Sequence, residues 1–417
     1  VLINHYETFL NHKILLDDST RLLISGELGT IYYCVKNFMK AKQFLEEASK
    51  EKYYNPTHTI KFLITLGKSY VQLDETKKMR KLGARLLMIY KKFLPKNDLH
   101  SALVLSTLGD MFDSQGDHKT ALKLVKESLQ IYRKHYPKGF FKEAQLLGIL
   151  GGICINAGDY KKAKTFIEEG LFVHKKFFPE DYHRIGWLSI YLGNAYVGLG
   201  DYHKAKDLLE IGVKAYKQFF PENHVATAWA MIYLANAYIK LKDYKKAQKL
   251  LEKNLTIYRK NYPANHDGLI RAMSFLTDAY MGLENYKKAK LLLEETLLGV
   301  TQRYGEKHIK AAQILQKLGK IYFYEEEIES AEHSLHKALK IFLQNKDPES
   351  YIGLELLADV SLKKSSIALS EGTEQQSQKF KKQAEDYLIK ALEIIKTNEL
   401  ESSPHIIRLQ EKLNRLE

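Results

Sequence analysis

The sequence has few of the residues that define several classes of protein. Its 417 residues include only two cysteines, two tryptophans and eight prolines. Two cysteines cannot build a disulfide framework or a four-ligand zinc site, which favours a reducing compartment, so we expect a cytoplasmic protein. The low proline and glycine content excludes a fibrous or low-complexity chain, and an apolar fraction of 45% excludes a disordered one.

Segments that direct a chain to a membrane are also missing. No apolar run approaches the roughly 18–20 residues that a membrane span needs, and the first residues lack the basic and then apolar order of a signal peptide. The chain does not begin with Met, so we interpret it as a fragment or a processed form. Its net charge is +14, which favours an acidic partner without identifying one.

Catalytic motifs are absent as well. The sequence contains no phosphate-binding loop, no dinucleotide-binding glycine motif, no nucleophile elbow and no HExxH zinc motif. His333 and His336 lie one helical turn apart, but no carboxylate or cysteine is placed to complete a metal site with them. We therefore expect no enzyme activity, no catalytic residue, no cofactor and no bound metal.

What the sequence does contain is a regular period. Five prolines are equally spaced and define it, at Pro95, Pro137, Pro179, Pro221 and Pro263. A series of small residues after leucine has the same spacing, at Gly67, Gly109, Gly151, Gly193, Ala235, Thr277 and Gly319. From Gly109 onward an alanine follows each of these at a constant distance, as Ala121 follows Gly109. Three series in one register indicate an internal repeat.

Each repeat is predicted to form two helices joined by a short turn. From His183 to Leu199 the apolar residues recur at spacings of three and four, as on one face of a helix. Gly200 suits the end of this helix, and Asp201 suits the N-cap of the next. Equivalent N-caps are predicted at Asn37, Asp117, Asp159, Asp243 and Asn285. Strand and hairpin signals are weak, so the fold class is all-α.

The residue pattern within each unit resembles the tetratricopeptide repeat. The match is carried by L-G-x-x-Y, then G-D-Y-x-x-A, then a closing proline, as in LGNAYVGLGDYHKA from Leu192 to Ala205. The usual unit has about 34 residues, and the surplus here lies in a longer second helix and its linker. This long form is similar to the repeats of kinesin light chains and of sensor arrays attached to signalling ATPases. The resemblance implies a right-handed superhelical array of antiparallel helix pairs with a concave channel.

The repeat register divides the chain into three regions. Residues 1–20 are predicted to form an N-terminal helix, either a cap or a truncated repeat, and residues 21–402 nine repeats. The ninth is expected to contain an inserted loop at about 364–378, where the sequence SEGTEQQSQ is polar. Residues 403–417 are predicted to form a capping helix, with Ser403 at the N-cap and Pro404 in its first turn.

The resemblance also implies a ligand surface. In this family the first helices line the concave face, and the residues two, five and nine places into each unit point into it. With Leu192 as the seventh place, units five, six and seven present Trp187, Ile190 and Asn194, then Trp229, Ile232 and Asn236, then Arg271, Ser274 and Asp278. Asparagine can bond a peptide backbone, while tryptophan and isoleucine form apolar pockets. The alternative is that the tryptophans only fill gaps between neighbouring first helices.

Two other repeated features have structural explanations. His224, His266 and His308 lie one period apart at the start of first helices, where we interpret them as helix caps or turn packing residues. The pairs Lys161-Lys162, Lys245-Lys246 and Lys287-Lys288 begin second helices and favour a solvated convex face. No recognition helix or stacking platform accompanies them, so we do not expect nucleic acid as the partner.

The leading hypothesis is a non-enzymatic scaffold or sensor that binds a peptide or protein segment in the channel. A carboxylate clamp of the co-chaperone type is not predicted, because Ile190 and Ile232 occupy the places where it needs lysine. Two alternatives from other classes remain open. One is a basic platform for RNA or anionic lipid, and the other is the regulatory repeat domain of a larger signalling ATPase. The oligomeric state is not indicated.

Overall fold

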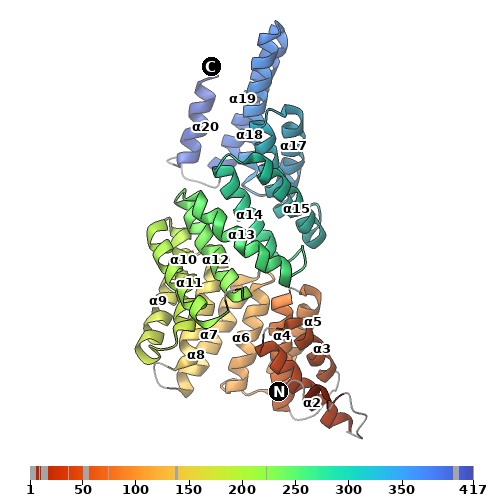
Figure 1. Ribbon diagram of the computed structural model, residues 1–417, viewed down its shortest axis with the longest axis vertical. Coiled ribbons are helices and arrows are strands. Elements are labelled where there is room, and N and C mark those ends of the chain that lie inside the picture. Colours follow the sequence, from red (N-terminus) through yellow and green to blue (C-terminus); the bar gives the residue numbers. More distant parts are fainter. Residues whose placement is uncertain are drawn as a thin grey trace. The chain divides into compact units, whose positions relative to one another are not determined.

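The computed structural model describes residues 6–8, 10, 17–35, 37–49, 56–73, 75–136, 140–221, 223–397 and 403–416. Every regular element in these residues is an α-helix (Figure 1). The chain divides into two compact units, Val1–Phe219 and Phe220–Glu417. The predicted all-α array of helix pairs is therefore confirmed.

The Val1–Phe219 unit consists of consecutive antiparallel helix pairs. Its helices are α2 (Asp18–Cys34), α3 (Phe38–Ala48), α4 (Pro56–Leu73), α5 (Thr76–Phe93), α6 (Leu99–Asp113), α7 (His118–His135), α8 (Phe141–Asn156), α9 (Tyr160–Phe177), α10 (Tyr182–Leu199) and α11 (Tyr202–Phe219). Each even-numbered helix is the first of a pair and packs on the helix that follows it. It also packs on the first helix of the next pair, so that α2, α4, α6, α8 and α10 form one continuous layer.

The Phe220–Glu417 unit repeats this arrangement. Its helices are α12 (Val225–Lys240), α13 (Tyr244–Asn261), α14 (Asp267–Gly282), α15 (Tyr286–Tyr304), α16 (Ile309–Tyr324), α17 (Ile328–Gln344), α18 (Ser350–Ser370), α19 (Glu374–Lys396) and α20 (Pro404–Asn414). The last helix, α20, packs alone against the final pair. Its Ile406 and Leu409 are fully buried, and Arg408 Nη2 lies 2.7 Å from a carboxylate oxygen of Glu355 on α18.

The small residues of the period explain why the two helices of a pair approach so closely. A Cβ atom added at Gly193 on α10 would lie 3.1 Å from the carbonyl oxygen of Ala205 on α11. Gly151 and Gly319 face the carbonyl of the equivalent alanine in the same way, at 3.3 Å. The glycine and alanine series therefore mark the two sides of one repeated crossing point, and the alanines are fully buried.

The predicted N-caps are present at the start of the second helices. The carboxylate of Asp201 accepts a hydrogen bond from the backbone N–H of Lys204 at 3.2 Å. The side chains of Asn37, Asp117, Asp159, Asp243 and Asn285 accept the equivalent bond. Gly200 ends α10 in the left-handed conformation, with φ of 83°, so the turn between paired helices is determined by its local sequence.

The repeated histidines cap first helices. Nδ1 of His224, His266 and His308 accepts a hydrogen bond from the backbone N–H two residues later, at 3.1–3.2 Å. The rings stack on the preceding aromatic residues, as His266 does on Tyr262 with a centroid distance of 3.9 Å. The structural interpretation of this series is confirmed.

The predicted loop at about 364–378 is wrong. In the structure α18 continues to Ser370, only Glu371 to Thr373 form the turn, and α19 begins at Glu374. The two long helices pack along their whole length, and the hydroxyl groups of Ser365 and Ser377 lie 2.8 Å apart in the buried interface. Glutamine, glutamate and lysine are good helix formers, so a polar sequence here is compatible with an exposed helix face.

The ends of the chain are only partly described. Most of the predicted helix of residues 1–20 lies outside the described residues, whereas Ser403 caps α20 and accepts a hydrogen bond from His405 N–H. Among the helices that the structure describes, none is both long and apolar enough to cross a membrane.

Candidate functional site

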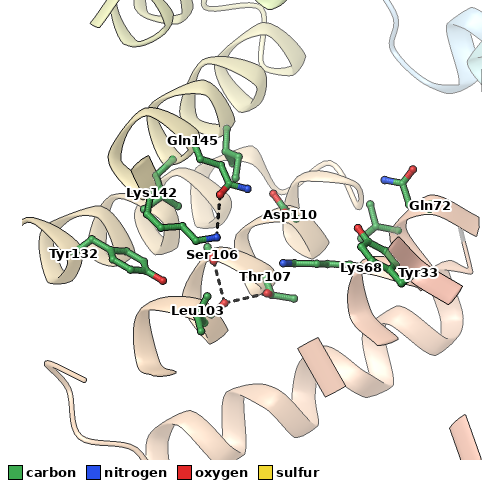
Figure 2. Close-up of a pocket in the computed structure, with 13 residues that line it drawn as sticks. Tyr33, Lys68, Gln72, Leu103, Ser106, Thr107, Asp110, Tyr132, Lys142 and Gln145 are labelled. Atoms are coloured by element: carbon green, nitrogen blue, oxygen red, sulfur yellow. Dashed lines mark hydrogen bonds between the residues drawn. The ribbon is translucent and has the colours of Figure 1, made fainter. Parts of the chain in front are cut away.

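A cavity of about 170 Å³ opens on the layer of first helices in the Val1–Phe219 unit (Figure 2). Its walls come from α2, α4, α6 and α8, with one tyrosine from α7. The lining residues are Tyr33, Lys68, Val71, Gln72, Leu103, Ser106, Thr107, Asp110, Tyr132, Lys142, Gln145, Leu146 and Ile149. Polar and charged groups therefore converge from successive repeats on one place.

The cavity occupies the same helix face on which the ligand surface was predicted, but in earlier repeats. Gln145 lies one period before Trp187 and Leu103 lies two periods before it, both at the second place of their units. Ser106 is at the fifth place, and Lys68 and Asp110 are at the ninth. The second, fifth and ninth places of units two to four therefore carry a sequence signal for this site, which the prediction for units five to seven does not include.

Two of the hydroxyl groups in the cavity already donate hydrogen bonds to the backbone. Ser106 Oγ and Thr107 Oγ1 each donate to the carbonyl oxygen of Leu103 at 3.0 Å. Lys142 Nζ donates to Gln145 Oε1, also at 3.0 Å, and Figure 2 shows the two side chains side by side on α8. The hydroxyl oxygens can therefore still accept hydrogen bonds, and the lysine ammonium group has two more protons to donate.

Three titratable groups of the cavity, Asp110, Lys142 and Tyr33, have shifted pKa values. Burial raises the pKa of Asp110 to about 7, although the nearby Lys68 opposes the shift. Burial lowers the pKa of Lys142 to about 8, and the positive charges of Lys68 and Arg184 lower it further. Burial and the charge of Asp110 raise the pKa of Tyr33 to about 12. Such shifts are typical of functional sites, although structural charge networks produce them too.

The structure places the predicted residues of unit five mostly in packing positions. The ring of Trp187 on α10 occupies the notch above Gly148 on α8, where an added Cβ would overlap it. Ile190 is only 1% exposed, because its side chain packs over Gly212 on α11. Asn194 is half-buried. The expectation that Ile190 points into an open channel is therefore wrong, because its side chain is buried over Gly212. Trp187 contacts Gly148 but keeps part of its surface exposed.

Units six and seven belong to the other compact unit. Ile232 is also buried, at 2% exposure, whereas Trp229 and Asn236 on α12 are partly exposed, as Trp187 and Asn194 are in unit five. The ring of Trp229 meets Tyr233 edge to face, with a centroid distance of 5.1 Å. Tyr233 in turn accepts a hydrogen bond from Arg271 Nη1 at 3.1 Å.

The charged residues predicted in unit seven are engaged with their neighbours. Arg271 Nη2 lies 3.0 Å from the carboxylate of Asp267. Lys317 on α16 donates to Ser274 Oγ at 3.2 Å and to the carboxylate of Asp278 at 2.6 Å. The structure thus links Trp229 on α12 to Arg271 on α14 through Tyr233, and Ser274 and Asp278 on α14 to Lys317 on α16.

In two of the lysine pairs that begin second helices, the second lysine forms an ion pair with the N-cap aspartate. Lys162 Nζ lies 2.5 Å from the carboxylate of its N-cap Asp159, and Lys246 lies 2.8 Å from Asp243. Lys246 also lies over the ring of Tyr238, at 5.4 Å from the centroid. The second lysine of each of these pairs therefore closes the turn, while the first, such as Lys161, is exposed.

The cysteines and histidines form no metal centre in the part of the chain that the structure describes. No three His, Cys, Asp or Glu side chains gather there in a way that could hold an ion. His333 and His336 are exposed on α17, and Cys154 is a fully buried core residue.

Comparisons with known proteins identify the repeat. Residues 101–139 and 225–297 match two family models, each described as tetratricopeptide repeat. No curated protein matches the sequence.

Solved structures share the arrangement of helices. A Rap protein complexed with competence and sporulation factor is 14% identical, with a TM-score of 0.55, over 90% of this chain and 99% of that one. NprR in complex with its cognate peptide NprX is 16% identical, with a TM-score of 0.51, over 72% of this chain and 85% of that one. A putative kinesin light chain from Podosopora anserina with TPR-like repeats is 20% identical, with a TM-score of 0.40, over 49% of this chain and 97% of that one. Residues 101–139 and 225–297 thus match the tetratricopeptide repeat, and the described residues of the chain form an all-helical array of helix pairs.

Proposed function

We propose that this protein is a non-enzymatic interaction scaffold or sensor that binds a peptide or protein segment along its layer of first helices. The observation that carries the proposal is the cavity between α4, α6 and α8. It combines the apolar walls of Val71, Leu146 and Ile149 with the polar groups of Lys68 and Gln145. Concave sites with a few convergent polar groups are the usual form of a binding site.

Similar structures support the same reading at the level of fold. The Rap protein and NprR mentioned above were each solved with a bound factor or peptide. Because their sequences differ so much from this one, they support the use of such an array for peptide binding and not the identity of a ligand.

The face that carries Trp229 is proposed as a second contact region. Trp229 and Asn236 retain exposed surface on α12, and Arg271 and Asp278 supply opposite charges on the adjacent α14. Here the tryptophan would supply apolar contact and the asparagine a donor and an acceptor for a peptide backbone.

A basic platform for RNA or lipid has less support. Lys162, Lys204 and Lys246 each pair with the N-cap aspartate three residues earlier. Part of the convex charge is therefore compensated locally, and we keep peptide binding as the proposal.

The proposal can be tested by filling the cavity. Ser106→Phe would place a ring among the lining residues, and Thr165→Phe is a matched control on the exposed face of α9. Peptides selected from a random displayed library against the wild-type chain are retested by fluorescence anisotropy. We expect Ser106→Phe to weaken their binding at least about tenfold, equal to about 1.4 kcal/mol, and Thr165→Phe to leave it unchanged. Equal binding to all three proteins would show that the peptides bind elsewhere.

A further inference from the structure

We propose that the cavity recognises an acidic side chain, aspartate or glutamate, of the bound segment, and that this carboxylate lies between Lys68 and Lys142. The inference rests on the proposed peptide-binding function and specifies the chemistry of the ligand at this place. It concerns the first-helix layer of the Val1–Phe219 unit alone.

The balance of charge in the cavity favours an anion. Its lining contains two cationic side chains, Lys68 and Lys142, and one carboxylate, Asp110, which gives a net charge of 2 − 1 = +1 when all three are ionised. In the described part of the chain no carboxylate lies within ion-pairing distance of either lysine. Most other partly buried lysines in this protein do have such a partner, as Lys317 has in Asp278 at 2.6 Å.

Lys142 is the group whose charged form a bound carboxylate would stabilise most. It is half-buried, and its ammonium group donates only to the neutral oxygen of Gln145. Arg184 on α10 and Lys68 on α4 both disfavour its charge. A carboxylate beside it would compensate this repulsion and accept its remaining protons, and such charge-assisted hydrogen bonds are about twice as strong as neutral ones.

Asp110 makes the recognition depend on pH. It is approached by Lys68 from α4, by Tyr33 from α2 and by Asp113 on its own helix. When ionised it repels an incoming carboxylate, and when protonated it can donate a hydrogen bond to one. Binding of an acidic side chain is therefore coupled to the uptake of a proton by Asp110.

The size of the cavity limits what enters it. A volume of about 170 Å³ is similar to the roughly 150 Å³ cavity that holds one benzene molecule. It lies well below the roughly 300–1,000 Å³ of sites for whole small ligands. One side chain fits, and the apolar walls formed by Leu146 and Ile149 suit the methylene groups that precede a carboxylate.

The experiment uses pools of hexapeptides that are acetylated and amidated, so that the peptide ends carry no charge. In each pool one position is fixed as Glu or as Gln, and binding to the full chain is measured by fluorescence anisotropy at pH 6.5. At one position we expect the Glu pool to bind at least about tenfold more tightly than the Gln pool, the scale of one charge-assisted bond. Lys142→Met and Lys68→Met should remove most of this preference. Lys142→Arg and the exposed-site control Lys161→Met should retain it.

A second variant distinguishes recognition from a merely structural role. Asp110→Asn removes the repulsive charge without changing shape, so it should strengthen binding of the Glu pool at pH 8.5 and flatten its dependence on pH. Weaker binding of the Glu pool to this variant would overturn the proposal. Two additional pools test the same point, one fixed as Lys and one Gln pool with a free C-terminal carboxylate. Tighter binding of either than of the Glu pool would also overturn the proposal.

The outcomes also separate this inference from the proposed function. If Glu and Gln pools bind equally and Ser106→Phe blocks both, the protein binds peptides in this cavity but does not select an acidic side chain. If no pool binds the wild-type chain, the proposed function fails as well. Circular dichroism of each variant shows whether it is folded, and a loss of binding is interpreted only for folded variants.

Discussion

Gly193 on α10 and Leu209 on α11 are in such close contact that a Cβ atom added at Gly193 would lie 2.6 Å from Leu209 Cγ. Gly109, Gly151 and Gly319 make the same close contact within their pairs, Gly319 with Leu335, whereas Gly67 on α4 faces Met111 and Thr107 on α6. In the pairs of Gly109, Gly151, Gly193 and Gly319 the helix spacing therefore depends on the absence of a side chain at the glycine.

Gly193→Leu should overpack this crossing and lower the free energy of unfolding by about 1–3 kcal/mol. The matched change is Gly353→Ala on α18, where an added Cβ meets nothing within 4 Å. That variant should be as stable as wild type or more stable by about 0.5–1 kcal/mol, because alanine favours the helix. Urea denaturation measures both. Hydrogen exchange should show protection lost first in α10 and α11 and their neighbours, since repeats couple to nearest neighbours; a uniform loss along the chain would contradict this.

The two tryptophans should behave differently. Trp187→Ala removes the ring that packs over Gly148 and should lower the free energy of unfolding by about 1–3 kcal/mol. Trp229→Ala should lower it less, and should weaken the binding of peptides that contact α12 by about 2 kcal/mol. Circular dichroism melts beside titration calorimetry with a selected peptide test the pair. An unfolded Trp229→Ala protein would assign that residue to packing as well.

The buried carboxyl group of Asp110 should lower the free energy of unfolding at neutral and basic pH, where it is ionised. Its pKa is raised to about 7 from 3.8, so between these values the folded chain binds more protons than the unfolded chain, and stability falls as the pH rises through this window. Asp110→Asn should therefore raise the melting temperature at pH 8, by the equivalent of about 1 kcal/mol or more, and have little effect at pH 4. An equal effect at both pH values would mean that the charge of Asp110 is not the cause.

His174 should make the stability of the fold depend on pH in the opposite direction. It is 1% exposed and stacks on Phe178 with a centroid distance of 5.3 Å. Burial lowers its pKa, although Asp181 at 3.4 Å opposes the shift. The unfolded chain therefore binds more protons just below pH 6.5, and stability is lost as the pH falls through that region. Compared with wild type, His174→Phe should lose less stability between pH 7.5 and pH 5 in urea denaturation.

The lysine pairs should contribute little to folding. Lys161→Glu removes an exposed positive charge from a helix N-terminus and should change stability by no more than about 0.5 kcal/mol, in the favourable direction. Lys162→Glu loses the contact with Asp159 and should cost a similar small amount, as exposed ion pairs do. Both variants should bind selected peptides as wild type does. A large loss of binding at low salt would instead favour the basic-platform alternative.

The helices could be predicted from the sequence because each boundary has a local chemical cause that recurs. Asp201 caps α11 through its own carboxylate, and Gly200 ends α10 because it adopts a positive φ without strain. These effects involve only neighbouring residues, and the period repeats them. The same reasoning fails at residues 364–378, because the packing of α18 along α19 decides the length of both helices.

The site could be predicted less well. A residue's place in the repeat predicts which helix face its side chain lies on, but not whether that side chain is buried or lines a cavity. Ile190 and Ser106 share the fifth place, yet Ile190 is buried over Gly212 and Ser106 lines a cavity. The difference comes from the size of residues on adjacent helices, which the period does not contain. The shifted pKa of Lys142 likewise depends on Lys68 and Arg184, which belong to other repeats and are distant in the sequence.

The docking of α20 has a consequence for the association of copies. This helix buries Ile406 and Leu409 and fixes its orientation with Arg408 on Glu355 and Lys412 on Asp359, the latter at 2.8 Å. In doing so it covers the apolar flank of α18 and α19 that would otherwise receive another helix pair. A repeat that ends in such a flank can accept the first pair of a second molecule as readily as its own continuation. We therefore expect that removing the eleven residues of α20 would expose this flank to water and favour association of copies through it.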